Sequence, residues 1–435
     1  MSARARELLG LFPVTLLTTC GFTAVYLARQ DEVGSATLTY GGIFLVLCLF
    51  VHLFIRRTLP DADPYLFPLV ALLAAFGLVM IYRLDEGLAR QQAGWFLVGI
   101  AFFVGTVLWL RDVMVLERYR YSIAAVGIAL LALPRLPAVG SQVNGAYLGV
   151  DVGPIAFQPT EFAKLCIVVF LASYLVERGE ALVTGARRVM GMTLPPLRHF
   201  GPLLVVWGGA MLMLIVIRDL GSSLMFFGAF LALLYVATAR LFFVLSGLTL
   251  FAAGSWFTAH TVAHIQQRFD IWLDPWREAS GNGYQIAQSL FAQADGGLFG
   301  KGFGEALLQL PNGRSILPAP HTDLIYAVIT DEIGLFGATA VVLVYLLFTE
   351  RGLKIASLAE DGFLKLLATG LTVVFALQAF VIIGGVTRVI PLTGVTLPFI
   401  SYGGSSIVAN FVLLALLLVI SQRARTTAPG RSPLV

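Results

Sequence analysis

The chain has 435 residues, of which 58% are hydrophobic and 12% are charged, with a formal net charge of +4 and a mean hydropathy of +0.86. So few charged side chains cannot cover the surface of a soluble protein of this length, which indicates a polytopic membrane protein instead. The positive charge comes mostly from arginines in the predicted loops, so it does not indicate a nucleic-acid partner.

Twelve apolar stretches are long enough to span a bilayer, because a hydrocarbon core of about 30 Å takes roughly 20 helical residues. They cover residues 9–28, 36–55, 64–82, 92–110, 121–137, 158–177, 200–217, 221–239, 241–260, 324–348, 363–385 and 402–421. Residues 1–60 form a predicted two-helix extension, and residues 61–435 form a ten-helix body. The predicted fold class is therefore an all-α polytopic membrane protein of about 12 transmembrane helices.

Basic residues predict how these spans are oriented. If both termini are cytoplasmic, most Lys and Arg side chains fall on the inner side, as the positive-inside rule expects. The short outer loops then hold only Arg29, Arg83, Arg90, Arg135 and Arg388. This orientation places residues 260–323, the one long polar loop, outside the cytoplasm, which excludes ATP-dependent chemistry there.

A run of glycines lies within this loop. It comprises Gly296, Gly297, Gly300, Gly302 and Gly304. The run does not fit either phosphate-binding glycine pattern, so it predicts tight turns or a close approach of the backbone to a ligand, and flexible loop glycines are the simpler alternative.

Ionisable residues within the predicted spans need a partner or a polar cavity, because each costs at least about 2.5 kcal/mol to insert. Glu161 and Lys164 are three positions apart and share a helix face. The other intramembrane charges are Arg218, Asp219, Asp331 and Glu332. Two interpretations stay open: ion pairs that hold the bundle together, or a polar cavity that faces outward. Arg388 is a candidate partner for one of the acids.

Asp323 stands directly before the apolar run that begins at Leu324. Thr322 or Asp323 is well suited to cap the start of that helix. Alternatively, Asp323 is a general base at the rim of the membrane, a role for which Thr322 as the cap would leave it available. His321 is either a proton carrier or an ordinary polar contact.

Other polar residues of the outer loop have two interpretations each. Cations that could hold a phosphate, or simply be solvated, are Arg268, Arg277, Lys301 and Arg314. His260 and His264 have the spacing of a metal-binding pair, but no third ligand is evident near them.

Several motifs together resemble the SEDS family, that of RodA and FtsW, over about residues 64–422. They are QPTEFAK (158–164), DLG (219–221), GYQIAQS (283–289), GGLFGKGFG (296–304), LPAPHTD (317–323), DEIGLFG (331–337) and LPFISYGGSS (397–406).

The resemblance implies a peptidoglycan glycosyltransferase of the bacterial cytoplasmic membrane, acting in cell elongation or division. Such an enzyme polymerises lipid II with inversion, using undecaprenyl-pyrophosphate-linked glycan as donor and a divalent cation, Mg²⁺ or Mn²⁺. The family's essential Asp corresponds to Asp323, and its Glu and Lys of the QPxExxK motif correspond to Glu161 and Lys164. The predicted substrate-binding residues are Glu161, Lys164, Arg268, Lys301, His321, Thr322 and Arg388. The resemblance also implies a class B penicillin-binding protein as partner.

Some positions depart from the family pattern. Many members have an Arg before the QP motif, where this chain has Ala156-Phe157, and Arg388 stands where the family is usually uncharged. We expect Arg388 to compensate for the missing contact. The alternative functions are a flippase for a lipid-linked precursor, which intramembrane charges would also suit, and a membrane scaffold without activity, against which the HTD and QPxExxK motifs argue.

Overall fold

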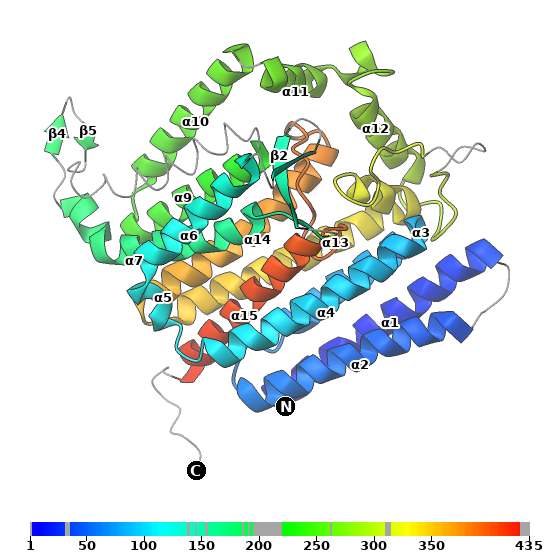
Figure 1. The fold of residues 1–435 in the computed structure, drawn as a ribbon, viewed down its shortest axis with the longest axis horizontal. Helices are drawn as coiled ribbons and strands as arrows, with labels where there is room; N and C mark the ends of the chain where they lie inside the picture. The colour runs from blue at the N-terminus through cyan, green and yellow to red at the C-terminus, as the bar shows by residue number, and fades with distance from the viewer. Residues whose placement is uncertain are drawn as a thin grey trace. The chain divides into compact units, whose positions relative to one another are not determined.

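The structure is a computed structural model that describes residues 2–30, 35–136, 140–143, 146–152, 155–184, 187–189, 192–194, 220–261, 263–308 and 315–426. Within these residues, eight helices are long and apolar enough to cross a membrane. They are α1 (Ala3–Gln30), α2 (Ser35–Thr58), α3 (Leu66–Leu84), α4 (Glu86–Trp109), α9 (Leu220–Thr238), α13 (Ile325–Leu358), α14 (Gly362–Val386) and α15 (Gly404–Thr426) (Figure 1). The chain is therefore an all-α polytopic membrane protein, as predicted.

Three further predicted spans coincide with helices that do not meet the same length and hydropathy criteria. These are α6 (Arg120–Ala132), α7 (Thr160–Thr184) and α10 (Leu241–Thr261). α6 gives way to the short 3-10 helix η1 (Leu133–Arg135) at Pro134, because proline lacks the N–H that would continue an α-helix. The predicted span 200–217 lies outside the described residues, so the total of twelve stays a prediction.

The polar segment 260–323 contains helices that the prediction of one long loop did not include. It contains α11 (Ala263–Leu273), the 3-10 helix η2 (Pro275–Glu278) and α12 (Tyr284–Gly296). α12 buries Ile286, Ser289, Ala292 and Gly296, which recur every three or four residues along one face. A short amphipathic helix of this kind has few apolar residues, so a search for apolar runs does not detect it.

Short antiparallel strands also form where no strand was predicted. A three-stranded sheet has the order β1 (Gly140–Val143), β2 (Ala146–Val152), β3 (Ile155–Phe157), with Gly140 opposite Val150 and Val150 opposite Phe157. β4 (Arg187–Val189) pairs with β5 (Met192–Leu194). The connections are two residues long, which is typical of β-hairpins. The short helix α5 (Met114–Arg118) precedes α6.

The chain divides into two compact units. The first comprises Met1–Val104, Gly254–Arg351 and Gln378–Asn410, and the second comprises Gly105–Ala253, Gly352–Leu377 and Phe411–Val435. In the first, α1 packs against α2 and α3; in the second, α7 packs against α6 and α9. The predicted division at residue 60 is a different one and stays a prediction.

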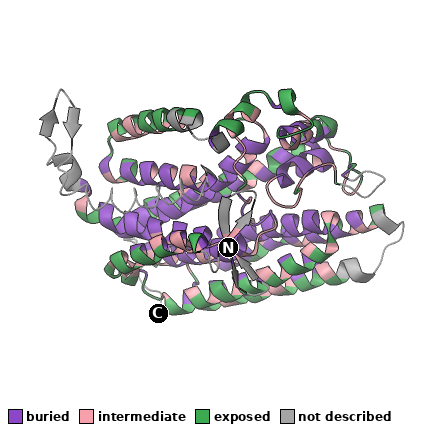
Figure 2. Ribbon diagram, turned by 45° about the horizontal axis from the view of Figure 1, so that its top comes forward, coloured by how far each residue is buried: buried purple, intermediate pink, exposed green. Residues whose placement is uncertain are grey.

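Burial differs strongly among the spanning helices (Figure 2). The apolar part of α3 is 83% buried, whereas that of α4 is 28% buried. The exposed side chains of α4 include Leu97 and Phe102, which are about half exposed. In a protein that spans a membrane, such a face contacts lipid, so the structure distinguishes an inner helix from one at the periphery.

α13 is broken at Gly334, where φ is +64° and the backbone leaves the helical conformation. The glycine-rich segment 297–302 pairs with this break: Lys301 N donates to Asp331 O (2.9 Å), Gly302 N donates to Glu332 O (2.9 Å) and Leu335 N donates to Gly297 O (2.9 Å). The glycine run does make a close approach, but to the backbone of α13; the predicted approach to a ligand stays a prediction. The contact satisfies backbone groups that a regular helix would pair internally.

Replacing Gly300 by Ala should therefore lower the melting temperature of the protein. Gly300 has φ +80°, and a Cβ there would lie 2.2 Å from the Glu332 carbonyl oxygen. The left-handed conformation alone costs a non-glycine residue about 1–2 kcal/mol. The control is Gly94→Ala on α4, where a Cβ meets nothing within 4 Å. Equal melting temperatures for both variants in a thermal shift assay would contradict the close packing.

Candidate active site

Asp323 lies two residues before the start of α13 and is half-buried. Its carboxylate accepts hydrogen bonds from Thr322 Oγ1 at 3.0 Å and from Gln285 Nε2, on α12, at 3.2 Å. Because α13 begins at Ile325, the position that caps the helix is Leu324 rather than Thr322 or Asp323. The carboxylate is thus held by the side chains of Thr322 and Gln285 and does not occupy the capping position, which favours the chemical role of Asp323 over the capping role.

The backbone around Asp323 is held by the segment that precedes α15. Ser401 Oγ donates to Thr322 O at 2.6 Å, and Tyr402 N donates to His321 O at 2.8 Å. The rings of His321 and Tyr402 meet edge to face, with centroids 5.8 Å apart. Residues 321–322 and residues 401–402, about 80 positions apart in the sequence, therefore hold each other in place.

Ser401 is in turn held from two sides. Its carbonyl oxygen accepts a hydrogen bond from Gln92 Nε2 of α4 at 3.0 Å, and its hydroxyl accepts one from Leu397 N at 2.8 Å. The Gln92 side chain is fully buried. Gln92, Gln285 and Ser401 were not among the predicted site residues. For Gln285 and Ser401 the signal was present, since both lie in motifs that carry the family resemblance.

Burial raises the pKa of Asp323 above its usual value, and the hydrogen bonds from Thr322 and Gln285 partly oppose this rise. Burial lowers the pKa of His321, which favours its neutral form near pH 7. A carboxylate with a raised pKa is a stronger base than an ordinary Asp, so the site is suited to accept a proton.

The predicted substrate-binding cations have different surroundings. Lys301 is exposed, on the glycine-rich segment. Arg268 donates to Leu392 O at 3.1 Å, and Arg388 donates to the carbonyl oxygens of Trp272 (2.7 Å) and Leu273. These contacts hold α11 against residues 388–392. For Arg268 and Arg388 the structure supplies a structural function, and substrate binding by these three cations stays a prediction.

Glu161 and Lys164 lie in the second unit, on the first turns of α7. Lys164 Nζ is 2.6 Å from Glu161 Oε2, and the two residues are 2% and 4% exposed. The predicted sharing of one helix face is confirmed. An ion pair of this kind holds both side chains in a fixed position, which a substrate-binding role would require as much as a structural one.

Glu332 is paired with Arg83, so it is not the intramembrane acid that Arg388 would neutralise. Arg83 Nε lies 2.9 Å from Glu332 Oε1, and Gly304 N donates to Glu332 Oε2 at 3.0 Å. Arg83 was placed in an outer loop, but it belongs to the last turn of α3. Asp331 is 5% exposed. Arg218 and Asp219 lie outside the described residues.

Comparison with known proteins places this arrangement in context. Residues 64–426 match the family profile described as cell cycle protein, that of FtsW, RodA and SpoVE. The peptidoglycan glycosyltransferase RodA of Mycobacterium bovis is 42% identical over 99% of this chain and 94% of its own length. Stage V sporulation protein E of Bacillus subtilis is 32% identical over 85% of this chain and 99% of its own length. The mycobacterial similarity therefore includes α1 and α2, which precede the family match.

Solved structures give the same picture of the fold. A structure described as "Structural coordination of polymerization and crosslinking by a peptidoglycan synthase complex" has a TM-score of 0.67 and 25% identity, covering 83% of this chain and 98% of that chain. The crystal structure of RodA from Thermus thermophilus has a TM-score of 0.60 and 23% identity, covering 84% and 98%.

Proposed function

Because the chain belongs to the family of FtsW, RodA and SpoVE, we infer that it is a peptidoglycan glycosyltransferase. The family match covers the body of the protein, and the mycobacterial RodA proteins are similar over nearly its whole length. The observation that best supports a chemical role is the carboxylate of Asp323, half-buried, with a raised pKa and held by Thr322 and Gln285.

We propose that the substrate is lipid II and that the reaction takes place at the outer face of the bacterial cytoplasmic membrane. The positions of the basic residues support this orientation, with both termini in the cytoplasm and residues 260–323 outside. In this arrangement twelve helices span the membrane, ten in the body and two in the N-terminal extension. Asp323 would then lie near the level where lipid-linked sugars meet the bilayer.

In the proposed reaction, the 4-hydroxyl of the acceptor's N-acetylglucosamine attacks C1 of the donor sugar. The new bond joins O4 to C1, the bond between C1 and the pyrophosphate oxygen breaks, and the configuration at C1 inverts. Asp323 takes the proton of the attacking hydroxyl, a contribution of about 10²–10⁴ in rate. Thr322 and Gln285 orient the carboxylate, while Glu161, Lys164 and Lys301 are the proposed contacts to the lipid-linked substrates.

Cationic groups would stabilise the pyrophosphate as it leaves. Within the described residues no three His, Cys, Asp or Glu side chains are grouped closely enough to ligate a metal ion. We propose that the ion is held partly by phosphate oxygens of the substrate. When bound, Mg²⁺ or Mn²⁺ would supply charge compensation for the leaving pyrophosphate.

Acidification should slow the enzyme as Asp323 becomes protonated at its raised pKa. The variant Gln285→Leu removes a hydrogen bond that lowers this pKa, so the pKa rises further and the acid limb of the pH–rate profile moves to higher pH. The control is Gln288→Leu on the same helix, which should leave the limb in place. Identical acid limbs for wild type and Gln285→Leu would argue against Asp323 as the titrating base.

The competing function is a flippase for a lipid-linked precursor, which buried charges within the spans would also suit. An assay that supplies lipid II and a divalent cation to the purified protein in vesicles distinguishes the polymerase from the flippase. Glycan chains seen on gels support the polymerase. Movement of lipid II headgroups across the bilayer without any glycan product would support the flippase and overturn the proposal.

We propose a class B penicillin-binding protein as partner, since a similar solved structure is described as a peptidoglycan synthase complex. α13 and α14 expose large apolar side chains, including Leu343, Leu346 and Phe380, each more than half exposed. A single membrane-spanning helix of the partner could pack on them. Unchanged co-purification after substitution of these three residues would count against this contact.

A further inference from the structure

A cavity of about 230 Å³ lies between the N-terminal extension and helices α3 and α4. Its wall is formed mainly by Phe22, Tyr40, Phe44, Leu47, Leu78 and Phe96. The helices that contribute these side chains are all long and apolar enough to span the membrane, so the cavity faces hydrocarbon rather than water. An apolar cavity in that environment is filled by the surrounding lipid, because an empty space forfeits dispersion contacts.

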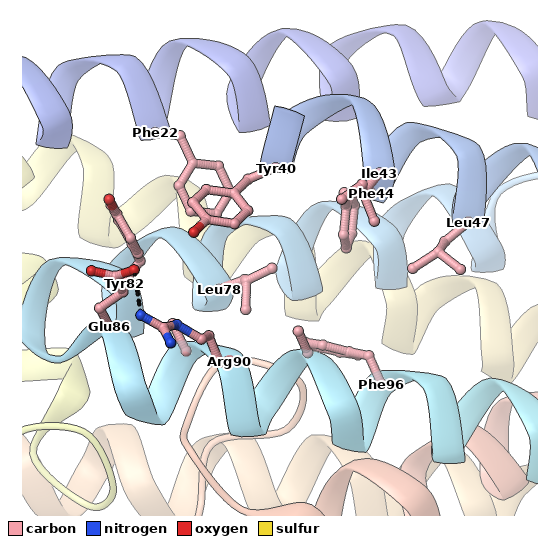
Figure 3. Close-up of a pocket in the computed structure, with 12 residues that line it drawn as sticks. Phe22, Tyr40, Ile43, Phe44, Leu47, Leu78, Tyr82, Glu86, Arg90 and Phe96 are labelled. Atoms are coloured by element: carbon pink, nitrogen blue, oxygen red, sulfur yellow. Dashed lines mark hydrogen bonds and ion pairs between the residues drawn. The ribbon is translucent and has the colours of Figure 1, made fainter. Parts of the chain in front are cut away.

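One end of the cavity is polar (Figure 3). Glu86 and Arg90 form an ion pair of 2.8 Å on the first turns of α4, with 42% and 72% of their side chains exposed. Tyr40 and Tyr82 lie beside this pair, and their rings are 5.8 Å apart. Leu47 and Phe96 lie at the other end, where the wall carries apolar side chains. The cavity therefore has the polarity of one lipid molecule, with a headgroup end and a chain end.

The length of the cavity agrees with one leaflet. Glu86 and Phe96 are ten residues apart on α4, which corresponds to about 15 Å of helix. This is half of the roughly 30 Å thickness of the hydrocarbon core. An acyl chain that enters beside Glu86 would thus reach Phe96 near the middle of the membrane.

Charge at the polar end selects the headgroup. The exposed guanidinium of Arg90 can bind a lipid phosphate, while Glu86 can accept hydrogen bonds from an ammonium group. An anionic headgroup would meet the Glu86 carboxylate as well as the Arg90 cation, whereas a phosphoethanolamine headgroup offers an opposite charge to both members of the pair. A choline headgroup has no N–H to donate.

We propose that this cavity binds a phosphatidylethanolamine molecule, which joins the N-terminal extension to α3 and α4. The phosphate contacts Arg90, the ammonium contacts Glu86, and one acyl chain fills the space lined by Phe44, Leu47 and Phe96. The site is separate from Asp323 and does not depend on the proposed function.

The test uses the purified full-length protein in mild detergent and native mass spectrometry. Ethanolamine, choline and glycerol phospholipids with the same acyl chains are added at equal concentration. The contacts to Arg90 and Glu86 lie at an exposed rim. They should make retention of the ethanolamine lipid about fivefold stronger than retention of the glycerol lipid. Equal or stronger retention of the glycerol lipid would overturn the proposal, as would displacement of the ethanolamine lipid by an equal concentration of a polyprenyl phosphate.

Three variants make the test specific. Glu86→Gln removes the ammonium contact but keeps Arg90, so the preference should shift to the anionic glycerol lipid. Ala93→Trp fills the cavity and should abolish retention of the ethanolamine lipid. Val98→Trp, on the lipid-exposed side of α4, is the matched control and should bind like the wild type. Ethanolamine-lipid binding that survives Ala93→Trp, or a preference unchanged by Glu86→Gln, would place the lipid elsewhere.

Discussion

Replacing Asp323 by Asn should lower the rate of glycan polymerisation by about 10²–10⁴, the usual contribution of a general base. The amide has nearly the same size as the carboxylate and can keep a hydrogen bond to Thr322 or Gln285. It cannot take a proton from the attacking hydroxyl. The expected effect is therefore a loss of kcat without a loss of folded protein. The measurement is the appearance of glycan from lipid II, together with the melting temperature of the variant.

A matched control tests whether the loss of activity comes from removing the base or merely from removing one negative charge. Asp270→Asn removes one negative charge from an exposed position on α11, a helix of the same polar segment. This variant should polymerise at the wild-type rate. If Asp323→Asn kept the wild-type melting temperature and retained most of the activity, Asp323 would not be the base.

Replacing Arg83 by Met should destabilise the protein by about 3–5 kcal/mol, the cost of leaving a buried charge without its partner. Glu332 has a fully buried side chain, and Arg83 is the cation that lies against it. Arg83 also donates to Ala306 O at 3.0 Å, so it holds the residues that follow the glycine-rich segment as well. Thermal or denaturant unfolding of the purified variant measures the loss.

The double variant Arg83→Met with Glu332→Gln tests whether the unpaired Glu332 carboxylate causes the loss of stability. Without the carboxylate there is no uncompensated charge, so the double variant should be more stable than Arg83→Met alone. Arg277→Met, at an exposed position, should leave the melting temperature unchanged. A double variant no more stable than Arg83→Met would mean that the arginine acts through packing or the Ala306 contact rather than through Glu332.

Much of the membrane architecture could be predicted from the sequence, since a spanning helix is specified by a local apolar run of known length. The runs at 9–28 and 363–385, for example, coincide with α1 and α14. The helices α11 and α12 were missed for the same reason, because they are short and polar on one side. The break of α13 was missed too, since Gly334 alone does not reveal that another segment will pair with the backbone beside it.

The sequence by itself determined the membrane class, the positions of most spans and, through its motifs, Asp323 as the candidate base. Only the tertiary structure decided the partners: Arg83 for Glu332, 249 residues away, and Gln285, Ser401 and Tyr402 around the residues 321–323. The physical reason is that hydropathy and helix period are properties of neighbouring residues, whereas a buried ion pair or hydrogen bond depends on which helices pack together and in which register.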